Sequence, residues 1–290
     1  MKFRKRHLLA MIPAWVALSA CDPATTVSVT PEGSTAGTSL TPPASSSASA
    51  SDPAPGPAAR VWSTDALLFT GSGTWSTEVS NLRTILGANG ASFREATSAQ
   101  LNAMSLDELS GFGVLIFPGG AGGTEASSLT SQTHANLRAA VQLRGVGYIG
   151  FCAGAFIGEA PAPAAGGDVS YGLGIVDGPI LDYYYLENQG TDIAMTLASF
   201  PDGSTRDLLW YGGPVTPGGA GVVIAKYPDG SPMISQLRSG KGLAVLVGTH
   251  PTANPATLSA LGVSSSDGIH QDFAWSLIHA AMQGKTLPAF

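Results

Sequence analysis

The chain is poor in cysteine and in charge. Its 290 residues include two cysteines, Cys21 and Cys152, and charged side chains make up only 12%. Two cysteines exclude a small domain stapled by several disulfides and a metal site built from several thiolates. The hydrophobic share of 44% is enough for a core, so a chain that is disordered throughout is also excluded.

Basic residues are scarce beyond the first six positions. Lys2, Arg4, Lys5 and Arg6 are four of the 14 basic residues, which leaves 10 for the rest of the chain against 20 acidic residues. Such an acidic body lacks the positive surface that nucleic acids require, so we expect no nucleic-acid partner. The sequence has neither a Walker motif nor a dinucleotide fingerprint, and we expect no cofactor and no bound metal.

The first 20 residues are typical of a secretory signal peptide. A basic stretch precedes the apolar run 8–20, which is too short to span a bilayer comfortably. The run ends in Leu18-Ser19-Ala20-Cys21, which resembles the bacterial lipoprotein box. The resemblance implies that Cys21 is acylated and anchors the protein to a bacterial membrane in the cell envelope, outside the cytoplasm. The alternative is an ordinary signal peptide followed by a chance cysteine.

Residues 21–60 form a second region, composed almost entirely of Pro, Ala, Ser, Thr and Gly. This composition offers too little apolar surface to offset the entropy of ordering, so we predict a disordered tether. Residues 61–290 are then expected to form one folded domain.

The first half of that domain alternates strand and helix patterns. Short apolar runs predict buried strands at 66–69, 114–117 and 147–151, with a weaker strand at 91–94. Helical spacing of apolar residues predicts helices over 79–86, 98–109 and 134–143. This order predicts an α/β fold with a mostly parallel sheet and helices on both faces.

The second half is richer in strand patterns. We expect extra strands at 171–176, 193–198, 207–211, 222–227, 233–237 and 243–247, and a closing helix over 270–282. Asp229-Gly230 between two of these runs predicts a hairpin turn.

Cys152 stands in the run Gly150-Phe151-Cys152-Ala153-Gly154, between a predicted buried strand and a helix. A Gly-x-nucleophile-x-Gly run in that context is typical of a nucleophile elbow. The helix N-terminus would favour the thiolate, and open α/β sheets bind ligands at the carboxyl ends of their strands. We therefore take Cys152 as the candidate nucleophile. The alternative is a small buried cysteine in a glycine-rich turn.

His250 is the candidate base among the five histidines. It follows the strand predicted at 243–247, so it would reach the same sheet edge as Cys152. The run Phe117-Pro118-Gly119-Gly120 follows another strand, and its free backbone N–H groups suit an oxyanion hole. We expect the N–H groups of Gly120 and Ala153 to form that hole.

Taken together, these segments resemble the class I glutamine amidotransferase-like superfamily, and within it the N-terminal domain family of biotin–protein ligases. The similarity runs from about Asp65 to about Pro251 and includes Phe69–Thr74, Phe117–Gly120, Gly150–Gly154, Trp210–Gly213, Gly240–Gly242 and His250-Pro251. It implies a flavodoxin-like, doubly wound sheet, a cysteine nucleophile and a histidine base.

The chain departs from the amidotransferase pattern at one catalytic position. In working amidotransferases a Glu two residues after the histidine orients the imidazole, and here that position holds Thr252. A hydroxyl cannot supply the carboxylate's charge. Asp267 and Asp272 are candidate replacements, although the sequence does not locate them. No synthase domain and no biotin-ligase catalytic domain follows, so we expect neither activity.

Three functions fit these features. The first is a Cys-His hydrolase or amidase that acts on small amides or esters, with Cys152 and His250 as its catalytic residues. The second is a non-catalytic module that binds an unknown small molecule and lacks the third triad residue. The third is a redox role for Cys152, which would lack a resolving cysteine in the folded domain. An ordinary thiol reactivity of Cys152 would favour binding alone.

Overall fold

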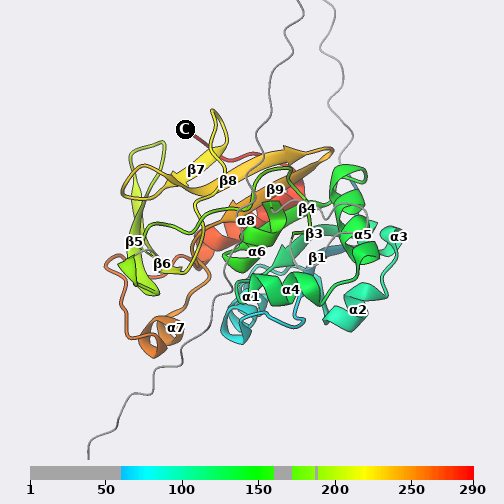
Figure 1. Cartoon of the computed structure of the whole chain (residues 1–290), viewed down its shortest axis with the longest axis horizontal. Coiled ribbons are helices and arrows are strands. Elements are labelled where there is room, and N and C mark those ends of the chain that lie inside the picture. Colours follow the sequence, from blue (N-terminus) through cyan, green and yellow to red (C-terminus); the bar gives the residue numbers. More distant parts are fainter. Residues whose placement is uncertain (1–59, 160–171, 187–188) are drawn as a thin grey trace, which may run out of the picture. The chain divides into compact units, whose positions relative to one another are not determined.

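The computed structural model describes residues 60–159, 172–186 and 189–290, which form one mixed α/β unit (Figure 1). Its strands are β1 (Thr64–Phe69), β2 (Phe93–Ala96), β3 (Phe112–Phe117), β4 (Gly147–Phe151), β5 (Ile193–Ser199), β6 (Thr205–Tyr211), β7 (Val223–Lys226), β8 (Pro232–Ser239) and β9 (Gly242–Val247). Its helices are α1 (Ser76–Ala88), α2 (Ser98–Asn102), α3 (Leu106–Ser110), α4 (Gly122–Ser127), α5 (Ser131–Gln142), α6 (Ala153–Glu159), α7 (Pro255–Ala260) and α8 (Gln271–Gln283).

All nine strands belong to one sheet in the order β2-β1-β3-β4-β9-β8-β7-β5-β6. The pairs from β2 to β9 are parallel, and those from β9 to β6 are antiparallel. The expected "mostly parallel" sheet is therefore corrected to a sheet that is parallel in one half only. The hairpins of the second half cause this, because a short turn such as the one at Asp229-Gly230 can join only antiparallel strands.

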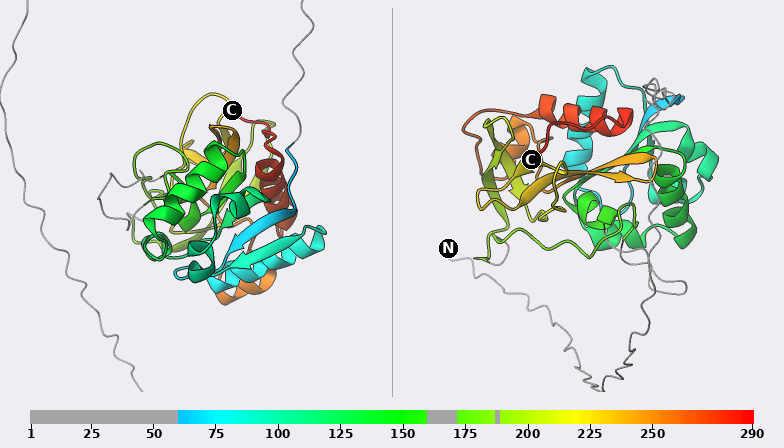
Figure 2. Two further views of the ribbon diagram at one scale, coloured as in Figure 1. Left: turned by 90° about the vertical axis from the view of Figure 1, so that its right-hand side faces the viewer. Right: turned by 90° about the horizontal axis from the view of Figure 1, so that it is seen from above.

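Alternate residues of the parallel strands point to opposite faces, and each face has its own helices. Leu68, Ile116 and Val245 lie in a core with α1 and α8. Leu67, Leu115 and Leu246 lie in the core on the other face, with residues of α2 to α6. Figure 2 shows the sheet between these two layers. Strands that are buried on both faces explain the continuous apolar runs in the sequence.

Two expected elements differ in the structure. The helix expected over 98–109 is two short helices, because Thr97 and Ser105 each begin a helix with a capping box. The strand expected at 171–176 is absent: residues 172–180 are neither strand nor helix, and Gly172 and Gly174 have φ of 78° and 60°, outside the extended region. Residue 171 is outside the described ranges. Sequence patterns did not reveal α4 or α7.

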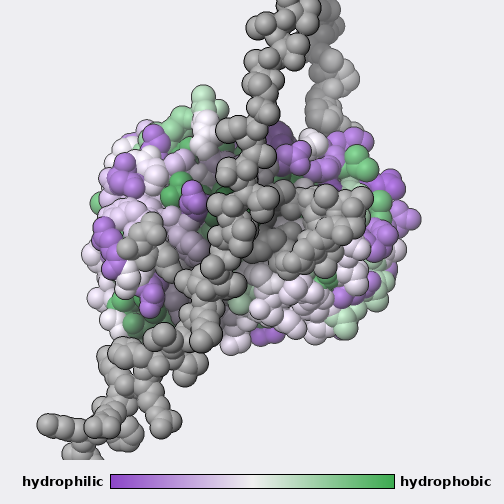
Figure 3. Space-filling model, viewed as in Figure 1, coloured by the Kyte–Doolittle hydropathy of each residue, from purple (hydrophilic) through white to green (hydrophobic). Residues whose placement is uncertain are grey.

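The signal peptide, the lipidation site Cys21 and nearly all of the predicted tether also lie outside the described residues. In the part of the chain that is described, no helix is long and apolar enough to cross a membrane. On the visible part of the face in Figure 3, hydrophobic residues are scattered among hydrophilic ones.

Candidate functional site

The candidate site lies at the carboxyl edge of the parallel half of the sheet. Strands β1, β3, β4 and β9 are parallel neighbours, so the loops that follow them meet at one edge. Gly119 and Gly120 follow β3, Cys152 follows β4, and His250 follows β9. The predicted site residues are therefore brought to the same place.

Cys152 occupies a strained turn between β4 and α6. It is the only described residue other than glycine with a positive φ, at 46°. Its backbone N–H donates to the Val247 carbonyl at 2.7 Å, which ties the turn to β9. A side chain at Gly154 would collide with the Phe117 carbonyl, so this second glycine lets α6 start against β3. These features are those of a nucleophile elbow, in which strain presents the nucleophile to the cavity.

The Cys152 thiol is 6% exposed and donates a hydrogen bond to the Tyr211 carbonyl at 3.3 Å. The ring of His250 is its neighbour across Gly119. A Cβ placed on Gly119 would lie 2.6 Å from His250 Cε1 and 3.3 Å from Cys152 Cβ. Both side chains also line one cavity. Glycine at position 119 therefore leaves the room in which the thiol and the imidazole approach each other.

His250 is oriented by a carboxylate that sequence reasoning missed. Its Nδ1 lies 2.9 Å from Glu78 Oε1, and both side chains are almost completely buried. The backbone N–H of His250 donates to the Leu209 carbonyl at 2.7 Å, and its ring meets Trp75 edge to face at 5.3 Å. Because Nδ1 is held by Glu78, Nε2 is the nitrogen available to Cys152. That nitrogen is buried and has no hydrogen-bond partner in the described structure.

Glu78 comes from the first turn of α1, 172 positions before His250. Its carboxylate also accepts hydrogen bonds from Thr252 Oγ1 at 2.7 Å and from the Gly119 N–H at 2.5 Å. The third residue, which the sequence left open because Thr252 stands in place of Glu, is therefore supplied by Glu78 rather than by Asp267 or Asp272. Thr252 donates a hydrogen bond to Glu78, and Glu78 contacts His250 in the role that a Glu at position 252 would otherwise have. An acid at helical spacing from the buried Leu82 was the available signal, since a carboxylate on a buried helix face needs a partner.

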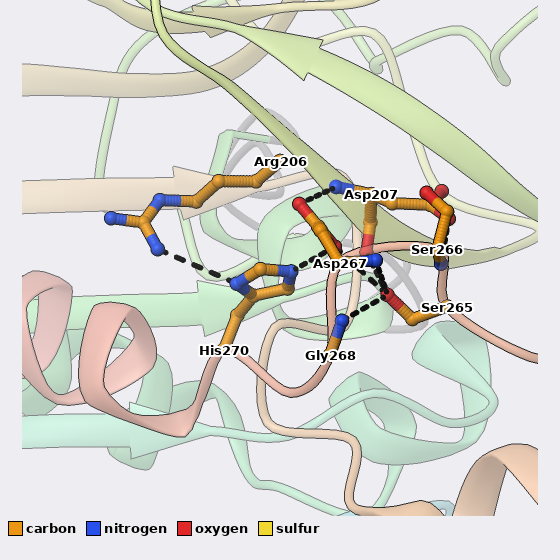
Figure 4. A network of polar contacts seen from close by, with 7 residues as sticks. All are labelled: Arg206, Asp207, Ser265, Ser266, Asp267, Gly268 and His270. Carbon is orange, nitrogen blue, oxygen red and sulfur yellow. Dashed lines mark hydrogen bonds and ion pairs between the residues drawn. The ribbon is translucent and has the colours of Figure 1, made fainter.

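The two alternative acids do not reach His250. Asp267 accepts from His270 at 2.8 Å and from the backbone of Asp207 at 3.0 Å, and this network ties the loop before α8 to the start of β6 (Figure 4). Asp272 lies in the first turn of α8 and makes no contact with His250 that the structure records. The sequence could not decide among these acids because only the tertiary fold brings α1 beside His250.

Charge stabilises this arrangement. Burial acts to lower the pKa of His250, but the Glu78 carboxylate and the Cys152 thiol outweigh it and hold that pKa well above its ordinary value. Burial acts to raise the pKa of Glu78, and His250, Thr252 and Gly119 together bring it below its ordinary value. The lowered pKa of Glu78 and the raised pKa of His250 agree, because both describe a carboxylate that faces an imidazolium. An imidazolium beside a cysteine stabilises the thiolate form of that cysteine.

The backbone N–H groups of Gly120 and Ala153 are both available to a ligand. The N–H groups of Ala121 and Trp75 donate to the Gly73 and Gly119 carbonyls, and these bonds join the two glycine loops, 71–73 after β1 and 119–123 after β3. The N–H groups of Cys152 and Gly154 donate to the Val247 and Pro118 carbonyls, outside the elbow. In the described ranges, neither Gly120 N–H nor Ala153 N–H has a backbone or side-chain acceptor. Both residues line the cavity beside Cys152. Two free donors beside a nucleophile can stabilise an oxyanion.

The cavity has two lobes that meet at Gly120, Cys152 and Tyr211. One lobe, of about 310 Å³, is also lined by Trp75 and His250. The other, of about 330 Å³, is also lined by Gly122, Gly123, Ala153, Phe156, Tyr183, Asp192 and Gly212. These volumes suit a small molecule. No group of three or more His, Cys, Asp or Glu side chains in the described ranges is arranged to hold a metal ion.

Comparison with known proteins gives weak structural similarity only. No family model matches the chain, and no curated protein matches it. Among the solved structures that match are a cytoplasmic protein from Salmonella typhimurium (12% identity, 77% of this chain and 99% of that one, TM-score 0.48) and a ThuA-like protein from Bacteroides uniformis (12%, 75% and 98%, 0.39). A third is an exo-beta-1,4-mannosidase from an Opitutaceae bacterium (14% identity, TM-score 0.41); the match covers 77% of this chain but only 36% of the mannosidase. Similarity at this level carries no inference about function.

Proposed function

We propose that the protein is a cysteine-dependent hydrolase or amidase that acts on small amides or esters through the triad Cys152, His250 and Glu78. The observation that carries the proposal is the Glu78–His250 pair buried beside a cysteine in a strained elbow. A binding module has no need to bury a carboxylate and an imidazole together, because burying both charges is costly unless they act as a pair. The amidotransferase-like resemblance and a flavodoxin-like, doubly wound arrangement belong to the same proposal.

In the first half of the reaction the Cys152 thiol first releases its proton to solvent. The thiolate, paired with the His250 imidazolium, then attacks the substrate carbonyl carbon while Nε2 keeps its proton. The carbonyl oxygen becomes an oxyanion and accepts from the N–H groups of Gly120 and Ala153. When the oxyanion collapses, the bond to the amine or alcohol breaks, and that group leaves with the proton from Nε2. An acyl thioester remains on Cys152.

In the second half, water gives one proton to Nε2 and its oxygen attacks the thioester carbon. Collapse breaks the C–S bond, releases the carboxylic acid and regenerates thiolate and imidazolium. Glu78 stays ionised throughout, because it holds the imidazole in position and stabilises its charged form.

The test is to trap the thioester. The protein is mixed with p-nitrophenyl butyrate, and intact-mass and peptide spectra are recorded within seconds. We expect a burst of p-nitrophenol and a butyryl group on Cys152, both absent from Cys152→Ala. His250→Ala should lose at least about 100-fold in rate. Binding of small molecules without any acylation of Cys152 would overturn the proposal and favour the binding module instead.

We also propose that acylated Cys21 tethers this domain to a bacterial membrane. The support is the run of sequence that ends in Leu18-Ser19-Ala20-Cys21. The substrate would then be met in the cell envelope.

A further inference from the structure

The two lobes of the cavity over Cys152 differ in their contacts, and this difference bears on the substrate of the proposed reaction. His250 lines only the lobe that contains Trp75, and Asp192 lines only the other. The leaving group must receive its proton from His250, so it belongs in the Trp75 lobe. The acyl chain, on the opposite side of the carbonyl carbon, then extends into the lobe with Asp192.

The acyl lobe has a negative character. Among the described residues that line either lobe, Asp192 is the one carboxylate, and the imidazolium of His250 lies in the other lobe. It is exposed, and in the described structure its carboxylate makes no hydrogen bond or ion pair. None of the described residues that line the two lobes is a Lys or an Arg. An anionic acyl chain in this lobe would therefore be repelled by Asp192, with no Lys or Arg there to offset the repulsion.

The aromatic walls of the same lobe favour a cation as well. Phe156 and Tyr211 line it beside Asp192, and Tyr211 is 40% exposed. The cations of the protein itself lie over other rings: Arg60 over Trp62, Arg206 over Phe200 and Phe273, and Lys226 over Phe290. No described Lys or Arg lies over Phe156 or Tyr211. Phe156 is 7% exposed and packs against Tyr183 with 4.8 Å between ring centroids, so Tyr211 offers most of the accessible aromatic surface, and such surfaces attract ammonium groups.

We infer that the acyl part of the substrate carries a positively charged amine, held between Asp192 and the rings of Phe156 and Tyr211. Asp192 is thus a residue that determines specificity and takes no part in the chemistry. The inference rests on the proposed function, because that function decides which lobe holds the acyl part of the substrate. The positive charge of that part is inferred from the residues that line the lobe.

The first experiment measures binding without turnover. Iodoacetamide, which is uncharged, alkylates Cys152, and n-butylamine, n-butanol and butyrate are compared as protecting molecules of similar size. We expect n-butylamine to protect at the lowest concentration. Asp192→Asn should raise that concentration about three- to fivefold, the effect of a charge pair at an exposed site. Asp107→Asn on α3 makes the same change of charge away from the cavity and should leave protection unaltered.

The second experiment compares p-nitrophenyl esters of 4-aminobutyrate, butyrate and succinate by their kcat/KM. The cationic ester should be cleaved fastest, and Asp192→Asn should lower the ratio of kcat/KM for the 4-aminobutyrate ester to kcat/KM for the butyrate ester, whereas Asp107→Asn should leave that ratio unaltered. Equal cleavage of all three esters, or equal protection by the three small molecules, would overturn the inferred specificity and leave the proposed function standing.

Failure of the proposed function would look different. If no ester acylates Cys152 but n-butylamine still protects it in a manner that depends on Asp192, the cavity selects cations and the hydrolase proposal is wrong. If iodoacetamide itself does not alkylate Cys152, binding of the three small molecules is followed by NMR chemical-shift changes, and no preference for n-butylamine there overturns the inference.

Discussion

Thr252 occupies the position at which a working amidotransferase carries its acid, and here it donates a hydrogen bond to Glu78. The carboxylate that holds His250 comes from α1 instead, and the Thr252 hydroxyl donates to it. A carboxylate introduced at 252 would therefore lie against an existing carboxylate in a buried site. Like charges at such a distance cannot both stay ionised without a large cost.

The first prediction follows from this contact. Thr252→Glu should lower both the melting temperature and the rate at which Cys152 is acylated, although it restores the residue expected from the family pattern. Thr252→Val removes only the hydroxyl and should cost about 1.5–3 kcal/mol of stability, the range for a hydrogen bond to a charged group. Thermal unfolding and the thioester burst measure the two effects. A Thr252→Glu variant more active than the wild type would contradict the role given to Glu78.

Glu125 in α4 is, with Glu78, a buried acidic residue close to the glycine loops that follow β1 and β3. Both of its oxygens are buried without a hydrogen-bond partner in the described structure, and one lies 3.0 Å from the place where a Gly120 Cβ would stand. Burial, with the nearby Glu78 carboxylate, raises the pKa of Glu125 well above its ordinary value. The folded protein therefore keeps Glu125 neutral at pH values where the unfolded chain ionises it.

The sign of the pH effect follows from linkage. As pH rises above the unfolded pKa of about 4.3, the unfolded state gains stability from ionised Glu125 and the folded state does not. The contribution of Glu125 to the stability of the wild type should fall by about 1.4 kcal/mol per pH unit until the folded pKa is reached, and this loss should be absent from Glu125→Gln. The stability of the variant relative to the wild type should thus grow from pH 4 toward pH 8. Denaturant unfolding across this range measures it. Glu95→Gln is the control of opposite sign, because Arg83 lowers the pKa of Glu95.

At the scale of elements, the first half of the domain could be predicted well from local pattern. The strands β1, β3 and β4 are buried on both faces, and their apolar runs are unmistakable in the sequence. The short helices α4 and α7 could not be predicted in this way, since each has six residues and too few turns for a hydrophobic period. The apolar residues of 171–176 indicate a strand, but Gly172 and Gly174 take left-handed φ values that a strand does not allow.

The elbow is the element on which the site depends, and the third prediction concerns its second glycine. Gly154→Ala places a Cβ against the Phe117 carbonyl, so the turn must shift. We expect about 1–3 kcal/mol of destabilisation, typical of overpacking, and loss of acylation at Cys152. Gly87→Ala in the last turn of α1 is the matched control: its Cβ meets nothing within 4 Å, and alanine in place of a helical glycine should stabilise by up to about 0.5–1 kcal/mol. Unchanged acylation in Gly154→Ala would show that the close approach does not position Cys152.

For the whole molecule, the sequence predicts that the ends of the strands before Cys152 and His250 meet at one edge of the sheet. It does not predict which acidic residue contacts His250 there. Cys152 and His250 were found because each follows a strong strand signal. Glu78 was missed because its partner is 172 positions away, and a contact at that separation leaves no local pattern. Apolar patterns also predict the strands of the antiparallel half of the sheet. The order of those strands in the sheet depends on hairpin connections, which hydrophobic periodicity does not specify.

The fourth prediction concerns the attachment of the whole molecule. Cys21→Ser in a bacterial host that processes lipoproteins should abolish incorporation of labelled palmitate and release the domain from the membrane fraction, because durable anchoring requires the acyl chains. The Cys152→Ser variant removes the other cysteine and should stay with the membrane. Equal fractionation of Cys21→Ser and the wild type would contradict the lipid anchor.

The measurement that tests the triad most directly is the protonation state of His250, read by NMR from ¹⁵N-labelled histidine rings and assigned by comparison with His250→Ala. Glu78 holds the pKa of His250 well above its ordinary value of 6.5, so both ring nitrogens should remain protonated at pH 7.5. In Glu78→Gln the opposing effect of burial is no longer outweighed by a carboxylate, and the ring should be neutral at that pH. A His250 that titrates near 6.5 in both proteins would contradict the Cys152–His250–Glu78 triad.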